Sequence, residues 1–133
     1  MMSERRYPAP QPNAETRVFW DAAAEGVLKI KNCRSCFRAH YYPRAICPHC
    51  GSDQTEWVVS EGAGEIYSVS VMRRGEGAPF AVAYVTLDEG PAVLTNIVDC
   101  DPDSLAIGQR VRVAFKPSEE GAPPVPTFTP SGD

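Results

Sequence analysis

The stretches CRSC (33–36) and CPHC (47–50) decide the fold of this chain. Each is a C-x-x-C knuckle, a tight turn that presents two thiolates, and ten residues separate the two. Four thiolates at tetrahedral corners are the ligand set of a structural zinc site, which leaves no position open for water or substrate. Free thiols or a redox pair are the alternative, but two paired C-x-x-C motifs are typical of metal sites. We therefore expect a zinc ribbon with one structural Zn²⁺ held by Cys33, Cys36, Cys47 and Cys50.

The remaining cysteine and the two histidines indicate no catalytic site. His40 and His49 lie close to the knuckles, but the cysteines already complete the ligand set, so we expect both histidines beside the site or on the surface. Cys100 lies between Asp99 and Asp101, whose charges disfavour its thiolate, and no histidine follows residue 61 to act as a base. Nucleophile-elbow, Walker and Rossmann motifs are absent from the sequence. We predict no catalytic residues.

Basic charge is concentrated on the cysteine segment. Residues 62–133 carry 5 basic and 10 acidic side chains, a net charge of −5. Nucleic-acid binding needs clustered Lys and Arg, so this acidic half argues against a broad nucleic-acid footprint, while a ribbon-led mode stays open. Residues 27–50 contain no acidic side chain and five basic ones: Lys29, Lys31, Arg34, Arg38 and Arg44.

The chain divides into three expected parts. Residues 1–12 contain three prolines and are expected to form a flexible arm. Residues 13–61 are expected to form an N-terminal helix and the zinc ribbon, and residues 62–133 a β domain with a Pro-rich tail. The helix is predicted over residues 14–25, with Asn13 as N-cap, Glu15 in the first turn and Gly26 as the stop.

Two adjacent aromatic residues, Phe19 and Trp20, lie in the middle of this predicted helix. Because neighbours on a helix point in different directions, the two rings need not share a role. We interpret both as core residues, and contact of one ring with a partner subunit is the alternative.

The second half of the chain has the pattern of a small β-barrel. Strands are predicted at 65–72, 80–87, 92–98 and 110–115, after a ribbon strand at 27–31 and a returning one at 56–59. In the first barrel strand Tyr67, Val69 and Val71 are expected on one face, and 80–87 is apolar enough to be covered on both faces. A last strand near 125–128 is rich in proline and is expected at an edge. The fold class is mainly β, and the five-stranded OB-fold is the best candidate.

The N-terminus, MMSERR, lacks the apolar core of a secretory signal, and no apolar run approaches the roughly 20 residues of a membrane span. Five cysteines interpreted mainly as metal ligands fit a reducing compartment. We expect a cytoplasmic protein without a membrane partner.

The order of helix, ribbon and barrel resembles the zinc-ribbon plus OB-fold family of acyl-CoA-associated proteins. The resemblance covers about residues 14–130. The matching stretches are Phe19 to Gly26, Cys33 to Cys50, Gly64 to Ser68, Pro79 to Gly90, Asp101 to Gly108 and Pro126 to Pro130.

The resemblance implies a rubredoxin-like ribbon and a function as a non-catalytic accessory subunit of a thiolase-type enzyme, or of an acyl-CoA hydratase or aldolase. The barrel would help bind or channel coenzyme A thioesters, and the ribbon and helix would dock on the partner. In this interpretation Phe19 and Trp20 are the expected interface anchors. A nucleic-acid-binding ribbon and barrel module is the alternative, and no residues support a free-standing enzyme.

Candidate contacts to the CoA phosphates are Arg73, Arg74 and Lys116. The adjacent arginines suit phosphate geometry, although a solvated loop is the alternative for them. The sequence departs from the family at Phe128-Thr129-Pro130, where relatives often carry a basic residue between the aromatic residue and the proline. This departure argues against a phosphate contact in the last strand.

Overall fold

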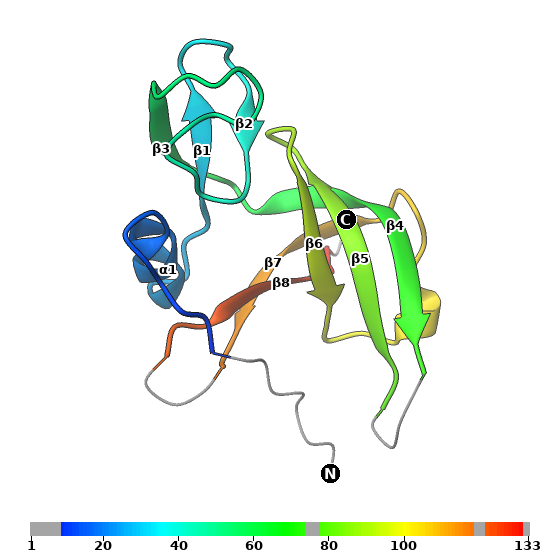
Figure 1. The fold of residues 1–133 in the computed structure, drawn as a ribbon. Coiled ribbons are helices and arrows are strands. Elements are labelled where there is room, and N and C mark those ends of the chain that lie inside the picture. Colours follow the sequence, from blue (N-terminus) through cyan, green and yellow to red (C-terminus); the bar gives the residue numbers. More distant parts are fainter. Residues whose placement is uncertain (1–8, 74–77, 119–121, 132–133) are drawn as a thin grey trace.

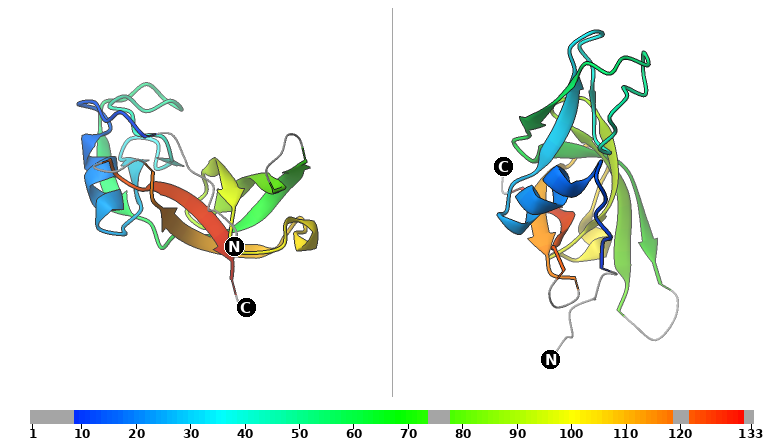
Figure 2. Two further views of the ribbon diagram at one scale, coloured as in Figure 1. Left: turned by 90° about the horizontal axis from the view of Figure 1, so that it is seen from below. Right: turned by 60° about the vertical axis from the view of Figure 1, so that its left-hand side comes forward.

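A computed structural model describes residues 9–73, 78–118 and 122–131 of the 133-residue chain. Most of the arm expected over 1–12 therefore lies outside the described residues, as does Arg74. The described chain forms one short α-helix, a three-stranded sheet and a closed five-stranded barrel (Figure 1). The fold class expected from the sequence is confirmed. The ribbon projects from one end of the barrel, and the helix lies beside the base of the ribbon (Figure 2).

Helix α1 (Arg17–Ala24) begins later than the sequence predicts. The Asn13 Oδ1 atom accepts hydrogen bonds from the backbone N–H groups of Glu15 and Thr16, both at 3.0 Å, and this turn delays the helix. Thr16 is the N-cap, and Glu15 lies before the first turn, where its carboxylate instead accepts from the backbone N–H of Ala45 at 2.7 Å. Gly26, with φ 79°, follows the end of the helix as expected.

Phe19 is a core residue and therefore not the interface anchor that the sequence suggested. It is 3% exposed, and its ring makes edge-to-face contacts with Trp20 at 4.9 Å and Tyr41 at 5.7 Å between centroids. Trp20 is half-buried and packs against the same core. The helix thus uses Phe19 to attach itself to the body of the protein.

The ribbon sheet contains β1 (Lys29–Cys33), β2 (Ala39–His40) and β3 (Thr55–Val59) in the order β2-β1-β3, and both pairings are antiparallel. The predicted strands at 27–31 and 56–59 correspond to β1 and β3. Strand β1 leads directly into the first knuckle, because its last residue is Cys33.

The barrel closes in the order β4-β5-β6-β8-β7. Its strands are β4 (Ala63–Met72), β5 (Phe80–Leu87), β6 (Ala92–Ile97), β7 (Arg110–Lys116) and β8 (Val125–Pro130). The short helix η1 (Pro102–Ser104) lies in the β6–β7 connection. Five strands closed in this way form the predicted OB-fold barrel.

Strand β8 is not the edge strand that its prolines suggested. It pairs with β7 over six residues and reaches β6 through the Ile97–Phe128 pair, where the Val98 N–H donates to the Phe128 carbonyl at 2.8 Å. Phe128 is fully buried. Proline, which lacks a backbone N–H, is tolerated in β8 because this strand makes few ladder hydrogen bonds to β6. Strand β8 therefore closes the barrel despite its prolines.

The expected alternation of β4 is interrupted by a bulge. Ile66 pairs with Val85 and Ser68 with Tyr84, so Tyr67 is the extra residue in the register. Tyr67 is 69% exposed, while Ile66 and Val69 both contact the core. The prediction that Tyr67 and Val69 share a face is therefore wrong.

Strand β5 is covered on one face only. Ala81, Ala83, Val85 and Leu87 are buried, whereas Tyr84 between them is 47% exposed. The expectation of a strand buried on both faces is wrong, because no helix covers the outside of β4, β5 and β6 in the described structure (Figure 1).

One hydrophobic core joins the helix, the ribbon strand and the barrel. Phe19, Leu28 and Ile30 belong to the same buried cluster as the barrel residues. Continuous packing holds the base of the ribbon on the barrel. The barrel members are Ile66, Ala81, Ala83, Val85, Leu87, Val93, Ile97, Val111 and Phe128.

The described part of the chain contains no helix that is long and apolar enough to cross a membrane.

Gly64 is required because the β4 backbone lies directly against β5 at this position. A Cβ atom at this position would lie 2.5 Å from the Thr86 carbonyl oxygen and 2.9 Å from Val85 Cγ1. We expect Gly64→Ala to lower the free energy of unfolding by about 2 kcal/mol through overpacking and the melting temperature by roughly 5–10 °C. Thermal unfolding measures this, with Ser70→Ala on the exposed side of the same strand as control. Equal melting temperatures for the two variants would contradict the role of Gly64.

Candidate metal centre

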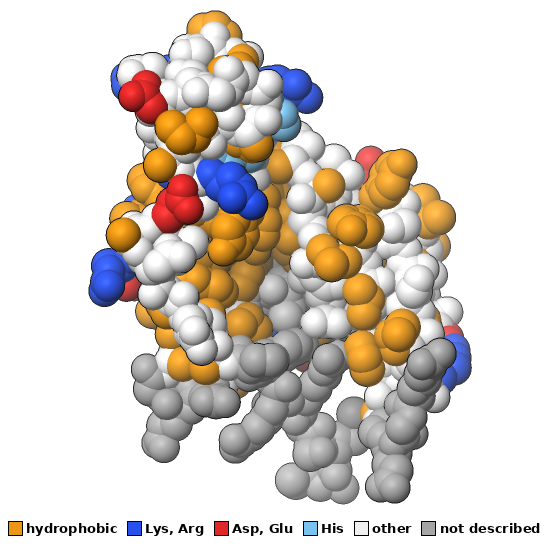
Figure 3. All heavy atoms as spheres, viewed as in Figure 1, with side chains coloured by type: hydrophobic (Ala, Val, Ile, Leu, Met, Phe, Trp, Pro, Cys, Tyr) orange, Lys and Arg blue, Asp and Glu red, His pale blue; other side chains and the backbone are white. Residues whose placement is uncertain are grey.

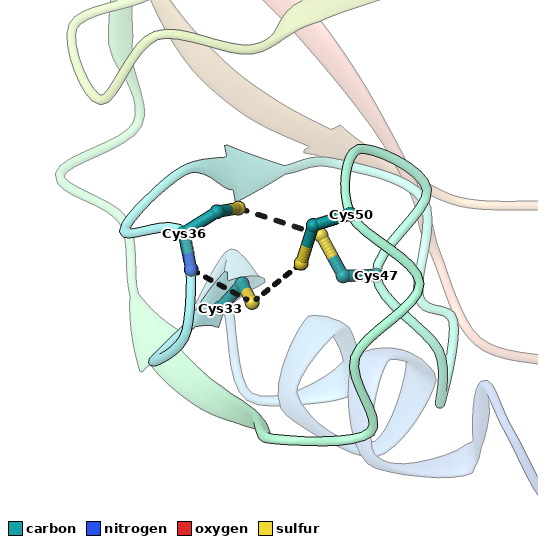
Figure 4. Close-up of side chains that lie close together, drawn as sticks. All are labelled: Cys33, Cys36, Cys47 and Cys50. Atoms are coloured by element: carbon teal, nitrogen blue, oxygen red, sulfur yellow. Dashed lines mark hydrogen bonds between the residues drawn. The ribbon is translucent and has the colours of Figure 1, made fainter.

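The four knuckle cysteines meet at one point between β1, β2 and the 47–50 turn (Figure 4). Their sulfur atoms all lie within 4.8 Å of one another, with Cys33 Sγ 3.7 Å from Cys50 Sγ and Cys36 Sγ 3.8 Å from Cys47 Sγ. Sulfurs at the corners of a tetrahedron around zinc, with Zn–S bonds of about 2.3 Å, are about 3.8 Å apart. The sulfur separations therefore fit Zn²⁺.

Backbone N–H groups of the two turns point at the sulfurs. Cys33 Sγ accepts from the N–H of Ser35 at 3.3 Å and of Cys36 at 3.5 Å, and Cys47 Sγ accepts from the N–H of His49 at 3.3 Å. These donors stabilise thiolates before any ligand binds. The hydrogen bond from Cys36, opposed by burial, lowers the pKa of Cys33 to about 6.

Two of the other thiols, those of Cys36 and Cys50, resist ionisation. Burial raises the pKa of Cys36. A backbone hydrogen bond from Ser52 lowers the pKa of Cys50, but burial and the neighbouring thiols outweigh it and raise the value to about 12. Four thiolates at this distance require a cation among them. The arrangement supports the predicted structural zinc, whose sphere the four sulfurs would close without a position for substrate.

The two histidines lie beside the cysteine cluster and do not belong to it. The only group of potential metal ligands found among the described residues consists of the four cysteines. His40 is 6% exposed, and burial lowers the pKa of its imidazole. The His49 ring is exposed and lies edge-on to the His40 ring at 6.5 Å.

A cleft of about 560 Å³ separates the ribbon from the β5–β6 turn. The ribbon side is lined by residues 37–41, Pro48 and His49, and the barrel side by residues 89–92. Glu89 is the acidic residue of this lining. Its carboxylate accepts hydrogen bonds from Ser60 Oγ at 2.9 Å and from the Glu61 N–H at 3.0 Å, in the segment that connects the ribbon to the barrel. Arg38 is exposed at the same cleft.

The two predicted CoA contacts that the structure describes each form an ion pair with an aspartate of the β6–β7 connection. Arg73, just after β4, forms an ion pair with Asp103 of η1. Lys116, at the end of β7, forms another with Asp99 at 2.8 Å. Arg74 lies outside the described residues.

Cys100 has the environment of an unreactive thiol. It is half-buried, and burial together with the charges of Asp101 and Asp99 raises its pKa. No histidine lies in the barrel sequence to act as its base.

Phe37 is the residue of this region that sequence reasoning missed. Its side chain is 81% exposed, and its φ of 62° is in the left-handed region, which non-glycine residues rarely adopt. The second knuckle carries Gly51, with φ 80°, at the corresponding position. The mismatch between Phe37 and Gly51 directly after the two C-x-x-C motifs is the sequence signal that marks it.

Comparison with known proteins identifies both parts of the chain. Residues 20–56 match the family model of the ChsH2 rubredoxin-like zinc ribbon domain, and residues 57–116 match that of the ChsH2 C-terminal OB-fold domain. The chain is 40% identical over 101 residues to a DUF35 domain-containing scaffold protein of Methanothermobacter thermautotrophicus, covering 71% of this chain and 76% of that protein.

A second relative is a probable enoyl-CoA hydratase alpha subunit of Thermomonospora curvata, with 34% identity over 108 residues. The match covers 78% of this chain but 34% of the relative, so the chain spans about a third of that subunit's length. Among solved structures, a chain of the Ltp2-ChsH2(DUF35) aldolase superposes with a TM-score of 0.78 at 31% identity, covering 91% of this chain and 98% of that one.

The fold and the cysteine cluster define a zinc-ribbon plus OB-fold protein. The matches are more specific: this chain belongs to the DUF35 family, with a ribbon and barrel of the ChsH2 type.

We expect the purified protein to contain one zinc per chain and Cys36→Ser to lose it. Without metal the thiols repel or protonate, so the ribbon tip should unfold, and acidification should release zinc because its ligands must be deprotonated. Metal analysis and amide hydrogen exchange check this: protection should disappear from β2 and the two knuckle turns and persist in β5. Cys100→Ser is the control and should keep both zinc and protection. A Cys36→Ser protein with full zinc content would refute the assigned ligand set.

Proposed function

We propose that this protein is a non-catalytic accessory subunit of an acyl-CoA enzyme complex, in which a separate subunit carries the catalytic residues. The observation that carries the proposal is the match to a chain of the Ltp2-ChsH2(DUF35) aldolase, which extends over 98% of that chain. Relatives described as a hydratase alpha subunit and as a scaffold protein support the same assignment. A tetrathiolate zinc centre, which stabilises structure and offers no open coordination position, suits such a subunit.

The nature of the partner follows from the same relatives. Relatives are described as alpha subunits of CoA-ester hydratases, and the matching structure is described as an aldolase. We therefore propose a hydratase- or aldolase-type catalytic subunit first and the thiolase-like one of our sequence-based expectation second. The barrel would help bind or channel the CoA thioester on its way to that subunit.

We further propose that Arg73, Arg74 and Lys116 contact the CoA phosphates. Two of these residues lie in the described structure, and each forms an ion pair with an exposed carboxylate: Arg73 with Asp103 and Lys116 with Asp99. A phosphate group offers the same cations a more highly charged acceptor than a carboxylate, and guanidinium matches its geometry. In this proposal the CoA phosphates compete with the two aspartates.

The accessory role predicts a stable complex with a catalytic subunit. Tagged protein purified from its host should bring down an acyl-CoA hydratase, aldolase or thiolase in near-equal amount, identified by mass spectrometry. The complex should act on its acyl-CoA substrate, and the zinc-loaded protein alone should show no turnover. Turnover by the isolated chain would contradict the accessory role, and recovery of RNA or DNA lost steeply with rising salt would indicate the nucleic-acid alternative.

The phosphate contacts predict opposite effects for the two members of each ion pair. Arg73→Ala and Lys116→Ala should each weaken CoA binding about tenfold, the value of a charge-assisted hydrogen bond. Asp103→Asn and Asp99→Asn should tighten binding, because each frees a cation from its carboxylate. Calorimetric titration of CoA into the purified complex measures this, with the exposed Arg112→Ala as control. Binding unchanged in the Arg73 and Lys116 variants would remove these residues from the CoA site.

A further inference from the structure

Phe37 adopts a backbone conformation that suits glycine. Both knuckles close with the same turn: the Phe37 N–H donates to the Cys33 carbonyl at 2.9 Å, and the Gly51 N–H donates to the Cys47 carbonyl at 2.9 Å. The left-handed φ that this turn imposes is free of steric cost for Gly51 and unfavourable for a side chain with a Cβ atom. Phe37 therefore destabilises the knuckle relative to glycine.

Packing does not compensate Phe37 for this strain. Its side chain is 81% exposed and is not part of the hydrophobic core. Residues held in such strained backbone conformations cluster at functional sites, where strain is retained for a reason other than folding.

The positive charge around Phe37 has no acidic partner within the described chain. The ion pairs formed by described residues all lie in the barrel. Three of the five ribbon cations have neutral partners instead: Lys31 Nζ lies 4.6 Å from the Trp57 ring centroid, Arg34 donates to the Gln54 side chain, and Arg44 lies over the Tyr42 ring.

The acidic residues of the ribbon form no ion pair with its cations in the described chain. Asp53 accepts a hydrogen bond from the Gln54 side chain, and Glu56 lies exposed on β3. On the β2 side, the Glu89 carboxylate already accepts hydrogen bonds from the Ser60 hydroxyl and the Glu61 N–H. The titratable side chains lining the cleft beside Phe37 are thus Arg38, His40, Tyr41 and His49, with Glu89 as the single acid already bound.

We propose that Phe37 and Arg38, with Pro48 and His49 beside them, form a docking surface for the catalytic subunit. The partner surface is acidic and carries an apolar pocket that takes the Phe37 ring, as the charge of the ribbon and the exposure of the ring require. This inference rests on the proposed function and specifies the surface it uses. Figure 3 shows basic, acidic, histidine and hydrophobic side chains on the ribbon, with a basic and a histidine side chain together at its right in this view.

The choice of Phe37 permits a variant that separates docking from folding. Phe37→Gly removes the ring and relieves the backbone, so its melting temperature should equal or exceed that of the wild type and its zinc content should be unchanged. Its affinity for the catalytic subunit co-purified with the wild type should fall about 30-fold or more, as for an aromatic hot spot. Leu94→Ser, which alters a 60% exposed residue on the outside of the barrel, is the matched control and should bind normally.

Charge is tested separately with Arg38→Glu. Wild-type affinity should decrease as ionic strength rises from about 50 to about 300 mM, where screening shortens from roughly 14 Å to roughly 6 Å. Arg38→Glu should bind more weakly and lose most of this salt dependence. Biolayer interferometry at the two salt concentrations gives both quantities.

Three outcomes would overturn the docking surface. The Phe37→Gly variant could bind the catalytic subunit as tightly as the wild type, or the Leu94→Ser variant could lose binding equally. Light scattering could also show a wild-type homodimer that Phe37→Gly abolishes. Each leaves the accessory role intact, because the wild-type complex still forms. Absence of any acyl-CoA enzyme from the wild-type purification would instead contradict the proposed function itself.

Discussion

Four sulfur atoms held within 4.8 Å of one another are the constraint on which the ribbon depends. Thiols at this distance cannot all ionise without a cation, and without ionisation they cannot bind one. The knuckle N–H groups begin the process by favouring the Cys33 thiolate, and a metal ion completes it. Since β2 contains two residues and the ribbon tip buries little apart from Cys33, Cys47, Pro43 and the polar His40, metal coordination takes the place of a hydrophobic core there.

A metal-held tip leaves the ribbon surface free for other tasks. Phe37, Tyr42 and Ile46 are at least half exposed, which a small domain stabilised by hydrophobic burial alone would not tolerate well. The tip can present a strained, exposed ring because the coordination sphere, and not the ring, stabilises the turn. The same logic explains why a tetrathiolate site without catalytic capacity is compatible with a role in recognition.

The base of the ribbon is held in a different way, by hydrophobic packing. Phe19, Leu28 and Ile30 join the barrel core, and the Glu89 carboxylate ties the β5–β6 turn to residues 60 and 61. The ribbon and the barrel therefore form one body with a cleft between them. A basic surface at one end and an acidic barrel at the other suit a protein that contacts a partner and a ligand with different parts.

The sequence by itself determined the ribbon and most of the strands. Zinc-ligand spacing is a local property, because each C-x-x-C turn presents its own two sulfurs whatever the rest of the chain does. An apolar run bounded by turn residues is equally local, and it located β5 at 80–87 with its observed bounds. The family resemblance carried by these same stretches identified the zinc-ribbon plus OB-fold family, which the family-model matches confirm.

Only the tertiary structure decided which side chains are buried and which are paired. Phe19 has the same pattern as an interface aromatic until β1 and the barrel cover it, and Phe37 differs from Gly51 in importance only because its ring points into solvent. Arg73 and Lys116 find their carboxylates 30 and 17 residues away. The place of β8 depends on β6, which lies two strands earlier in the chain, as well as on the preceding strand β7. Periodicity reports a residue's neighbours along the chain, whereas burial and ion pairing depend on neighbours that only the closed barrel brings into contact.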